Sequence, residues 1–170
     1  MFGPEIETVV AQLADVLRAR GERLVTAESC TGGLVAAACT SIAGSSDWFE
    51  RGFVTYSNEA KVEMLGVDAE LIARHGAVSE EVVRAMAQGA LARSRATWSI
   101  AVSGVAGPGG GTATKPVGLV WTALGGPGGV HAEARTWPGE RTEVRMASVV
   151  YALELLVQAA ARAPRGGSVR

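Results

Sequence analysis

The strongest pattern at the start of the chain is a helical repeat of apolar residues. Between residues 5 and 20, apolar side chains recur at the three- and four-residue spacing of one helix face, at Ile6, Val9, Val10, Leu13, Val16 and Leu17. Gly21 follows as the expected stop, because glycine readily adopts the left-handed conformation that ends many helices. Further helices are predicted up to about residue 42 and over 58–65, 79–93 and 139–161.

Five segments have the β-branched and aromatic character of strands, namely 23–26, 51–56, 97–105, 117–124 and 129–137. The glycine-rich turn at 125–129 joins the last two segments as a hairpin. Helices alternate with the early strands, and a hairpin ends the sheet. The sequence therefore predicts an α/β fold with three α/β/α layers and a mixed, mostly parallel sheet of about five strands. Residues 1–163 are expected to form a single domain and 164–170 a flexible tail.

The composition of the chain limits the kinds of molecule that this domain is expected to bind. Apolar residues make up 48% of the 170 residues, and the 16 basic and 17 acidic residues nearly balance, so we expect a packed globule that binds no nucleic acid. Two cysteines and two histidines, without CxxC or His-x-x-His spacing, predict reduced thiols and no metal site. The acidic start is unlike a signal peptide, and no run is long enough to span a bilayer. A cytoplasmic protein without membrane contact is therefore expected.

A hydroxyl and a thiol lie where the first predicted strand meets a helix, in Ala27-Glu-Ser-Cys-Thr-Gly-Gly33. The N–H groups at a helix start lack internal partners and carry a partial positive charge, so they would stabilise the oxyanion of a tetrahedral intermediate. We expect Thr31, Gly32 and Gly33 to supply these N–H groups. The alternative interpretation is that Ser29 or Thr31 only caps the helix.

A serine nucleophile needs a base, and neither histidine lies in a recognisable triad context. Lys61, at the end of Tyr56-Ser-Asn-Glu-Ala-Lys61, is the remaining candidate. A lysine acts as a base only if its pKa falls from about 10.4 toward roughly 7 to 8. Tyr56 would relay the proton or hold the amine in line, whereas Glu28 would oppose the shift if it paired with Lys61. A solvated surface lysine is the alternative.

A glycine-rich loop follows the third predicted strand, at Ser103-Gly-Val-Ala-Gly-Pro-Gly-Gly-Gly-Thr112. Its bare N–H groups would form an anion-binding nest. The expected ligand contacts are Gly107, Gly109, Gly110 and Gly111. This is not a Walker loop, because the nearby Lys115 is followed by proline rather than by Ser or Thr. A flexible connection between strands is the alternative.

Two arginines lie four residues apart at the start of the last predicted helix. This spacing places Arg141 and Arg145 on the same face, where their guanidinium groups would clamp a phosphate. The helix start would add to the attraction for an anion. Ordinary ion pairs with Glu140 or Glu143 are the alternative.

The chain resembles the competence-damage-inducible protein A (CinA) C-terminal domain family in five segments, AESCTGG, VTYSNEAK..MLGV, GAVSEEV, SGVAGPGGG..KPVGLVW and GERTEVR. Their order and spacing match from about residue 5 to 162. The family includes stand-alone nicotinamide-nucleotide amidases, which convert nicotinamide mononucleotide (NMN) and water to nicotinate mononucleotide and ammonia. This chain resembles that form, without the N-terminal molybdopterin-binding-like domain of longer relatives.

The resemblance implies that Ser29 is the nucleophile and Lys61 the general base, with Tyr56 beside them. It also implies a homodimer, and ligand contacts from the glycine loop 107–111 and Arg145. The expected reaction is attack of Ser29 on the carboxamide of NMN, release of ammonia and hydrolysis of the acyl-enzyme, with no cofactor.

Several alternatives to this reaction remain open. Cys30 is a rival nucleophile. In a second alternative, the domain is a non-catalytic interaction module tied to competence or DNA damage. In a third, it is an amidase for another small amide. Arg51 stands where the family commonly has glycine, and it would alter substrate preference or depress the pKa of Lys61 if it faced the site.

Overall fold

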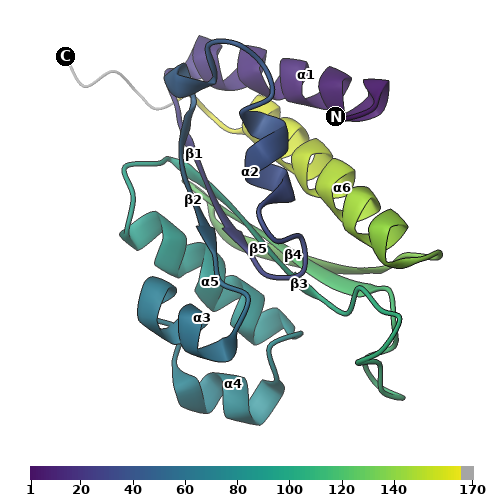
Figure 1. Ribbon diagram of the computed structural model, residues 1–170. Helices are drawn as coiled ribbons and strands as arrows, with labels where there is room; N and C mark the ends of the chain where they lie inside the picture. The colour runs from purple at the N-terminus through teal and green to yellow at the C-terminus, as the bar shows by residue number, and fades with distance from the viewer. Residues whose placement is uncertain (166–170) are drawn as a thin grey trace.

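The computed structural model describes residues 1–165, which fold around one five-stranded sheet (Figure 1). The elements are α1 (Pro4–Arg20), β1 (Leu24–Glu28), α2 (Leu34–Cys39), the 3-10 turn η1 (Ser45–Asp47), β2 (Phe49–Val54), α3 (Asn58–Leu65), α4 (Ala69–His75), α5 (Glu80–Ala92), β3 (Trp98–Gly104), β4 (Leu119–Gly126), β5 (Gly129–Thr136) and α6 (Arg141–Arg162). Of the tail expected at 164–170, residues 166–170 lie outside the described part.

The sheet has the strand order β2-β1-β3-β4-β5. β1 pairs in parallel with β2 and β3, whereas β4 pairs antiparallel with both β3 and β5. Every strand except β4 therefore runs in the same direction, which confirms the mixed, mostly parallel α/β sheet. A further consequence is that β1, β2 and β3 all end at the same edge, where ligands of such sheets commonly bind.

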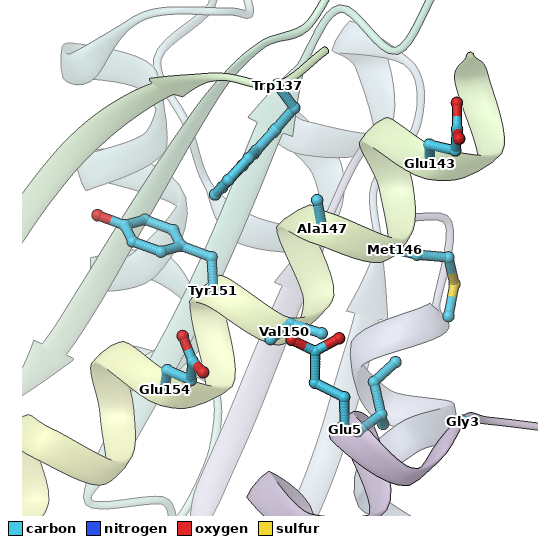
Figure 2. A pocket seen from close by; sticks show the side chains of 10 residues that line it. Gly3, Glu5, Trp137, Glu143, Met146, Ala147, Val150, Tyr151 and Glu154 are labelled. Carbon is cyan, nitrogen blue, oxygen red and sulfur yellow. The ribbon is translucent and has the colours of Figure 1, made fainter. Parts of the chain in front are cut away.

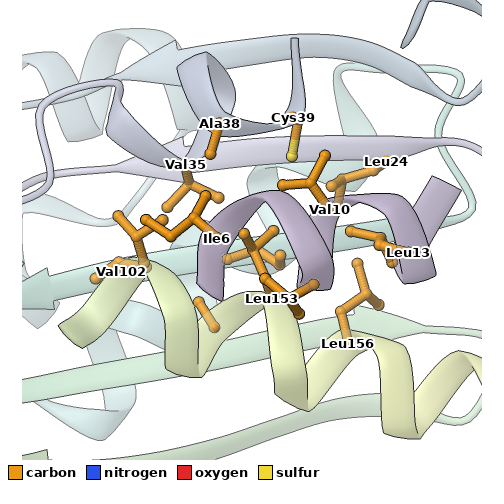
Figure 3. Close-up of a cluster of buried hydrophobic side chains, with 14 of the residues drawn as sticks. Ile6, Val10, Leu13, Leu24, Val35, Ala38, Cys39, Val102, Leu153 and Leu156 are labelled. Carbon is orange, nitrogen blue, oxygen red and sulfur yellow. The ribbon is translucent and has the colours of Figure 1, made fainter. Parts of the chain in front are cut away.

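Helices cover both faces of the sheet, with α1, α2 and α6 on one side and α3, α4 and α5 on the other (Figure 1). On the first side, apolar side chains of α1 and α6 converge with those of α2 and the sheet (Figure 3), among them Ile6, Val10, Leu13, Val35, Leu153 and Leu156. The interior strand β1 is buried along its whole length, as expected for a strand covered on both faces.

The last helix, α6, is long and apolar enough to cross a membrane by length and composition alone. Its residues Val149, Leu153 and Leu156 are fully buried and belong to the core that α6 shares with α1. α6 is therefore a core helix of the domain.

Two parts of the structure differ from the sequence prediction. β1 continues to Glu28, a turn occupies the next five residues, and α2 is only six residues long instead of reaching residue 42. The sequence pattern also predicts no helix at Ala69–His75, where the structure contains α4. Its cap residue Asp68 accepts a hydrogen bond from the Glu70 N–H at 2.9 Å. Both helices are too short to show a full apolar repeat.

α5 packs closely on the end of α3 at Gly89, where a Cβ atom would lie 2.1 Å from the carbonyl oxygen of Leu65. We expect Gly89→Ala to lower the free energy of unfolding by about 1–3 kcal/mol, because backbone must move to admit the methyl group. This steric cost outweighs the gain of about 0.5–1 kcal/mol that alanine normally brings to a helix interior. Urea denaturation measures the change.

The matched control is Gly128→Ala in the β4–β5 turn, where an added Cβ meets nothing within 4 Å. Its effect should stay below about 0.5 kcal/mol. A Gly89→Ala protein as stable as this control would contradict the close packing of α5 on α3.

Candidate active site

Ser29 and Lys61 meet at the edge where the parallel strands end. Ser29 directly follows β1, and its N–H donates to the Val102 carbonyl of β3 at 2.9 Å. Lys61 lies in the first turn of α3, the helix that follows β2. The Lys61 Nζ atom is 3.1 Å from the Ser29 Oγ atom, and the two residues are 1% and 8% exposed. The fold thus brings together the two residues that the sequence marked as nucleophile and base.

Burial of the Lys61 amine disfavours its charged form. Nζ donates to the carbonyl oxygens of Thr55 at 2.9 Å and Tyr56 at 3.2 Å. When the amine is neutral, two such bonds use both of its hydrogens and leave its lone pair for the Ser29 hydroxyl hydrogen. The Ser57 carbonyl lies at the longer distance of 3.5 Å from Nζ. Within residues 1–165, Lys61 forms no ion pair, and burial lowers its pKa from the ordinary 10.5. Lys61 is therefore not a solvated surface lysine.

The neighbouring carboxylate, Glu28, points away from Lys61 toward α2. Its two oxygens accept hydrogen bonds from the N–H groups of Val35 at 2.8 Å and Ala36 at 3.0 Å, and the residue is fully buried. Glu28 therefore satisfies the start of α2, which is favourable for a negative charge. It does not hold the Lys61 amine in its charged form.

The turn between β1 and α2 contains the three residues expected to bind an oxyanion. Gly32 and Gly33 have φ angles of 59° and 99°, which glycine adopts without strain. The Gly32 N–H donates to the Ser29 carbonyl at 3.0 Å, whereas those of Thr31 and Gly33 donate to no residue of the described chain. The helix cap is Gly33, without a side-chain bond, so the interpretation of Ser29 or Thr31 as a cap is wrong.

Arg145 of α6 supports this turn from outside. Its Nε donates to the Cys30 carbonyl at 3.0 Å, and its Nη2 donates to the Thr31 carbonyl at 3.2 Å. The C=O and N–H of a trans peptide point in opposite directions, so holding the Cys30 carbonyl also directs the Thr31 N–H. Arg145 thus orients the nucleophile turn, and it does not line the cleft beside Ser29.

Tyr56 and Arg141 form a pair at the mouth of the site. The Arg141 Nη2 donates to the Tyr56 phenol oxygen at 3.2 Å, and the Arg141 Nη1 donates to the Gly107 carbonyl at 2.9 Å. The phenol of Tyr56 makes no hydrogen bond to Lys61 or Ser29 among the described contacts, whereas its backbone carbonyl does contact Lys61. The two arginines, which the sequence predicted to clamp one phosphate together, therefore hold different groups. Arg141 holds Tyr56 and Gly107, whereas Arg145 holds the turn after β1.

A cleft of about 240 Å³ opens beside the dyad. Its lining residues are Ser29, Cys30, Tyr56, Lys61, Ala77, Val78, Ser103, Gly104, Ala106 and Arg141. Ala77, Val78 and Ser103 were not predicted as site residues, although Ser103 is the next-to-last residue of β3 at the expected edge. The Ser103 Oγ donates to the Ala77 carbonyl at 2.7 Å and so joins β3 to the turn before α5. Gly109–Gly111 are exposed in their loop and do not line the cleft.

Two other residues raised by the sequence have lesser roles here. Cys30 is 6% exposed, and burial raises its pKa to about 11, so almost no reactive thiolate forms near neutral pH. Arg51 pairs with Glu50 at 2.7 Å and donates to the Arg93 carbonyl at 3.0 Å, and it does not line the cleft. Across residues 1–165, no group of three or more His, Cys, Asp or Glu side chains is arranged to hold a metal ion.

A larger groove of about 540 Å³ lies elsewhere, between the start of α1 and α6 (Figure 2). Ile6, Met146 and Val150 give it an apolar lining, and Glu5 and Glu154 also line it. None of the residues that the sequence marked as functional lines this groove. The smaller cleft, which contains the nucleophile and the base, is therefore the candidate active site.

Residues 6–160 match the model of the family described as CinA C-terminal domain. The nicotinamide-nucleotide amidohydrolase PncC of Shigella flexneri is 52% identical over 162 residues, which cover 93% of this chain and 96% of that protein. A CinA-like protein of Anaeromyxobacter sp. (strain Fw109-5) is 49% identical over 156 residues, which cover 92% of this chain and 38% of that protein. The crystal structure of competence/damage inducible protein CihA from Agrobacterium tumefaciens has a TM-score of 0.91 and 48% identity, covering 95% of this chain and 99% of that one.

The buried carboxylate at the start of α2 gives a stability prediction. In Glu28→Gln, one of the two acceptor oxygens becomes an NH₂ group that faces a backbone N–H. We expect the free energy of unfolding to fall by about 1–3 kcal/mol, because one buried N–H loses its partner. Urea denaturation at neutral pH measures the loss. Glu154→Gln, on the outer part of α6, is the control, and equal stability of the two variants would contradict the role of Glu28.

Proposed function

Because the chain belongs to the CinA C-terminal domain family, we propose that it hydrolyses NMN to nicotinate mononucleotide and ammonia. A relative 52% identical over 93% of the chain carries the name nicotinamide-nucleotide amidohydrolase, so the chain is grouped with hydrolases that act on an amide. The observation that carries the mechanism is the distance of 3.1 Å between Lys61 Nζ and Ser29 Oγ in a cleft at the sheet edge.

The reaction begins with transfer of the Ser29 hydroxyl proton to the neutral Lys61 amine. As the proton leaves, Oγ attacks the carboxamide carbon and forms a tetrahedral intermediate. The Thr55 and Tyr56 carbonyls hold the amine in place, which fixes its lone pair on Oγ. Such positioning lowers the barrier because the reacting groups are already aligned.

The intermediate places a negative charge on the former carbonyl oxygen. Thr31 and Gly33 supply the N–H groups that remain for this oxyanion, since the Gly32 N–H already donates to Ser29. Lys61, now an ammonium, returns its proton to the amide nitrogen as the C–N bond breaks, and ammonia leaves. Water then attacks the ester on Ser29 with Lys61 again as base, which releases nicotinate mononucleotide and restores the hydroxyl.

The phosphate of the substrate would lie near Arg141, which lines the cleft beside the glycine loop. Arg141 retains donors beyond the two that hold Gly107 and Tyr56, since a guanidinium has five N–H groups. Gly107, Gly109, Gly110 and Gly111 remain proposed contacts through their N–H groups. Arg145 contributes indirectly, through the turn that it supports.

The wider setting of the enzyme is also part of the proposal. We propose a cytoplasmic homodimer that acts on a small nucleotide without a cofactor, a membrane or a nucleic acid. The nearly balanced charge of the chain supports the absence of a nucleic-acid partner, because DNA-binding surfaces are strongly basic.

Replacement of either dyad residue tests the mechanism. Ser29→Ala and Lys61→Met should each reduce ammonia release from NMN by at least about 10³-fold, because nucleophile and base act as one unit. An enzyme-coupled ammonia assay measures the rate, and circular dichroism checks the fold. Two control variants should stay active. Cys30→Ala removes the rival nucleophile, and Lys115→Met removes the chain's other lysine. Turnover that survives in the Ser29 or Lys61 variant would reject that residue's role.

The pH dependence follows from the state of Lys61. Only the neutral amine accepts the Ser29 proton, so kcat/KM falls as the pH drops through the Lys61 pKa and levels off above it. Because burial lowers that pKa, the inflection should lie below 10.5. Measurement of kcat/KM from about pH 6 to about pH 10 tests this expectation. A kcat/KM that falls as the pH rises through this range would contradict a lysine base.

A further inference from the structure

Tyr56 presents an exposed aromatic ring at the edge of the active-site cleft. The residue lines the cleft together with Ser29 and Lys61, yet it is 62% exposed. Most other large aromatic residues of the described chain are buried or half-buried, among them Trp48 and Trp98. An exposed ring beside a nucleophile is therefore available for contact with a substrate.

Tyr56 makes hydrogen bonds through its backbone and through its phenol. Its backbone carbonyl accepts a hydrogen bond from Lys61 Nζ at 3.2 Å, and its phenol oxygen accepts one from Arg141 Nη2 at 3.2 Å. Arg141 is itself fixed by the Gly107 carbonyl at 2.9 Å. Tyr56 is thus linked through its backbone to the dyad and through its phenol to Arg141, and both Tyr56 and Arg141 line the cleft.

The cleft has no negatively charged side chain that could bind a cationic ring. Among its ten lining residues none is Asp or Glu, and Lys61 and Arg141 are basic, so the face of Tyr56 is the group in this lining that can attract a cation. The face of a tyrosine attracts cations through its quadrupole. The carboxamide that reacts with Ser29 is attached to a pyridinium ring, which is planar, aromatic and positively charged.

We infer that Tyr56 recognises the pyridinium ring by stacking, and so selects oxidised nicotinamide nucleotides over the reduced dihydropyridine form. The reduced ring carries the same carboxamide and phosphate, but it is neutral and not aromatic. This inference rests on the proposed NMN hydrolysis, and it assigns Tyr56 to substrate selection instead of proton relay.

Binding to the inactive Ser29→Ala protein tests the inference without turnover. Isothermal titration calorimetry gives the Kd of NMN and of reduced NMN for this protein and for its Tyr56→Phe and Tyr56→Leu derivatives. We expect NMN to bind more tightly than reduced NMN, and Tyr56→Phe to keep that preference. Tyr56→Leu should weaken NMN binding by about 2- to 30-fold, with a smaller change for reduced NMN. Equal weakening for both nucleotides, or no change for NMN, would overturn the inference.

Turnover with Ser29 intact separates selection from proton relay. Tyr56→Phe keeps the ring and removes the hydroxyl, so it should keep a larger share of kcat/KM for NMN than Tyr56→Leu, whose KM for NMN should rise by about 2- to 30-fold. A large loss of kcat in Tyr56→Phe at unchanged KM would make the phenol a relay and overturn the inference. An inactive wild type that still binds NMN in a Tyr56-dependent way would refute only the proposed reaction. Absence of binding would refute both.

Discussion

A buried amine that faces carbonyl oxygens and no carboxylate is the constraint on which this site depends. Lys61 is almost fully buried, and its nearest acceptors are the backbone carbonyls of Thr55 and Tyr56 together with Ser29 Oγ. Desolvation disfavours the ammonium form, and an adjacent carboxylate would reverse that effect. The parallel ends of β1 and β2 create this arrangement, because they place the serine and the lysine on the same sheet edge.

Glu28 is a buried carboxylate that supports the start of α2 without pairing with Lys61. A carboxylate directly before the nucleophile would be expected to pair with the lysine, but both of its oxygens accept N–H groups at the start of α2. The same contact anchors the helix that follows the nucleophile turn. On the other side, Arg145 holds two carbonyls of that turn, so elements far apart in the chain fix the position of Ser29. The contacts that hold the fold together around Ser29 therefore also determine which charges surround Lys61.

The sequence predicted those parts of the fold that show a clear pattern of residues within one continuous segment. The apolar repeat of α1 and the predicted helices over 58–65 and 79–93 agree with α1, α3 and α5 of the structure. The short α4 has too few residues for such a pattern. Elimination and family resemblance together marked Ser29 and Lys61, but no local signal gives the direction of a side chain. The bonds of Arg145 to residues more than 110 positions away, and of Tyr56 to Arg141, arise only when α6 packs beside the sheet edge.

The most direct test of this account is the titration of Lys61 itself. The chain contains only two lysines, so ¹³C NMR of protein labelled at the lysine Cε carbons gives two signals, which the Lys61→Arg variant assigns. A lysine base requires that the Lys61 signal titrate at a lower pH in the folded protein than in concentrated urea, where its pKa should have the ordinary value of about 10.4. A Lys61 signal that titrates at the same or a higher pH in the folded protein than in urea would contradict its role as the base.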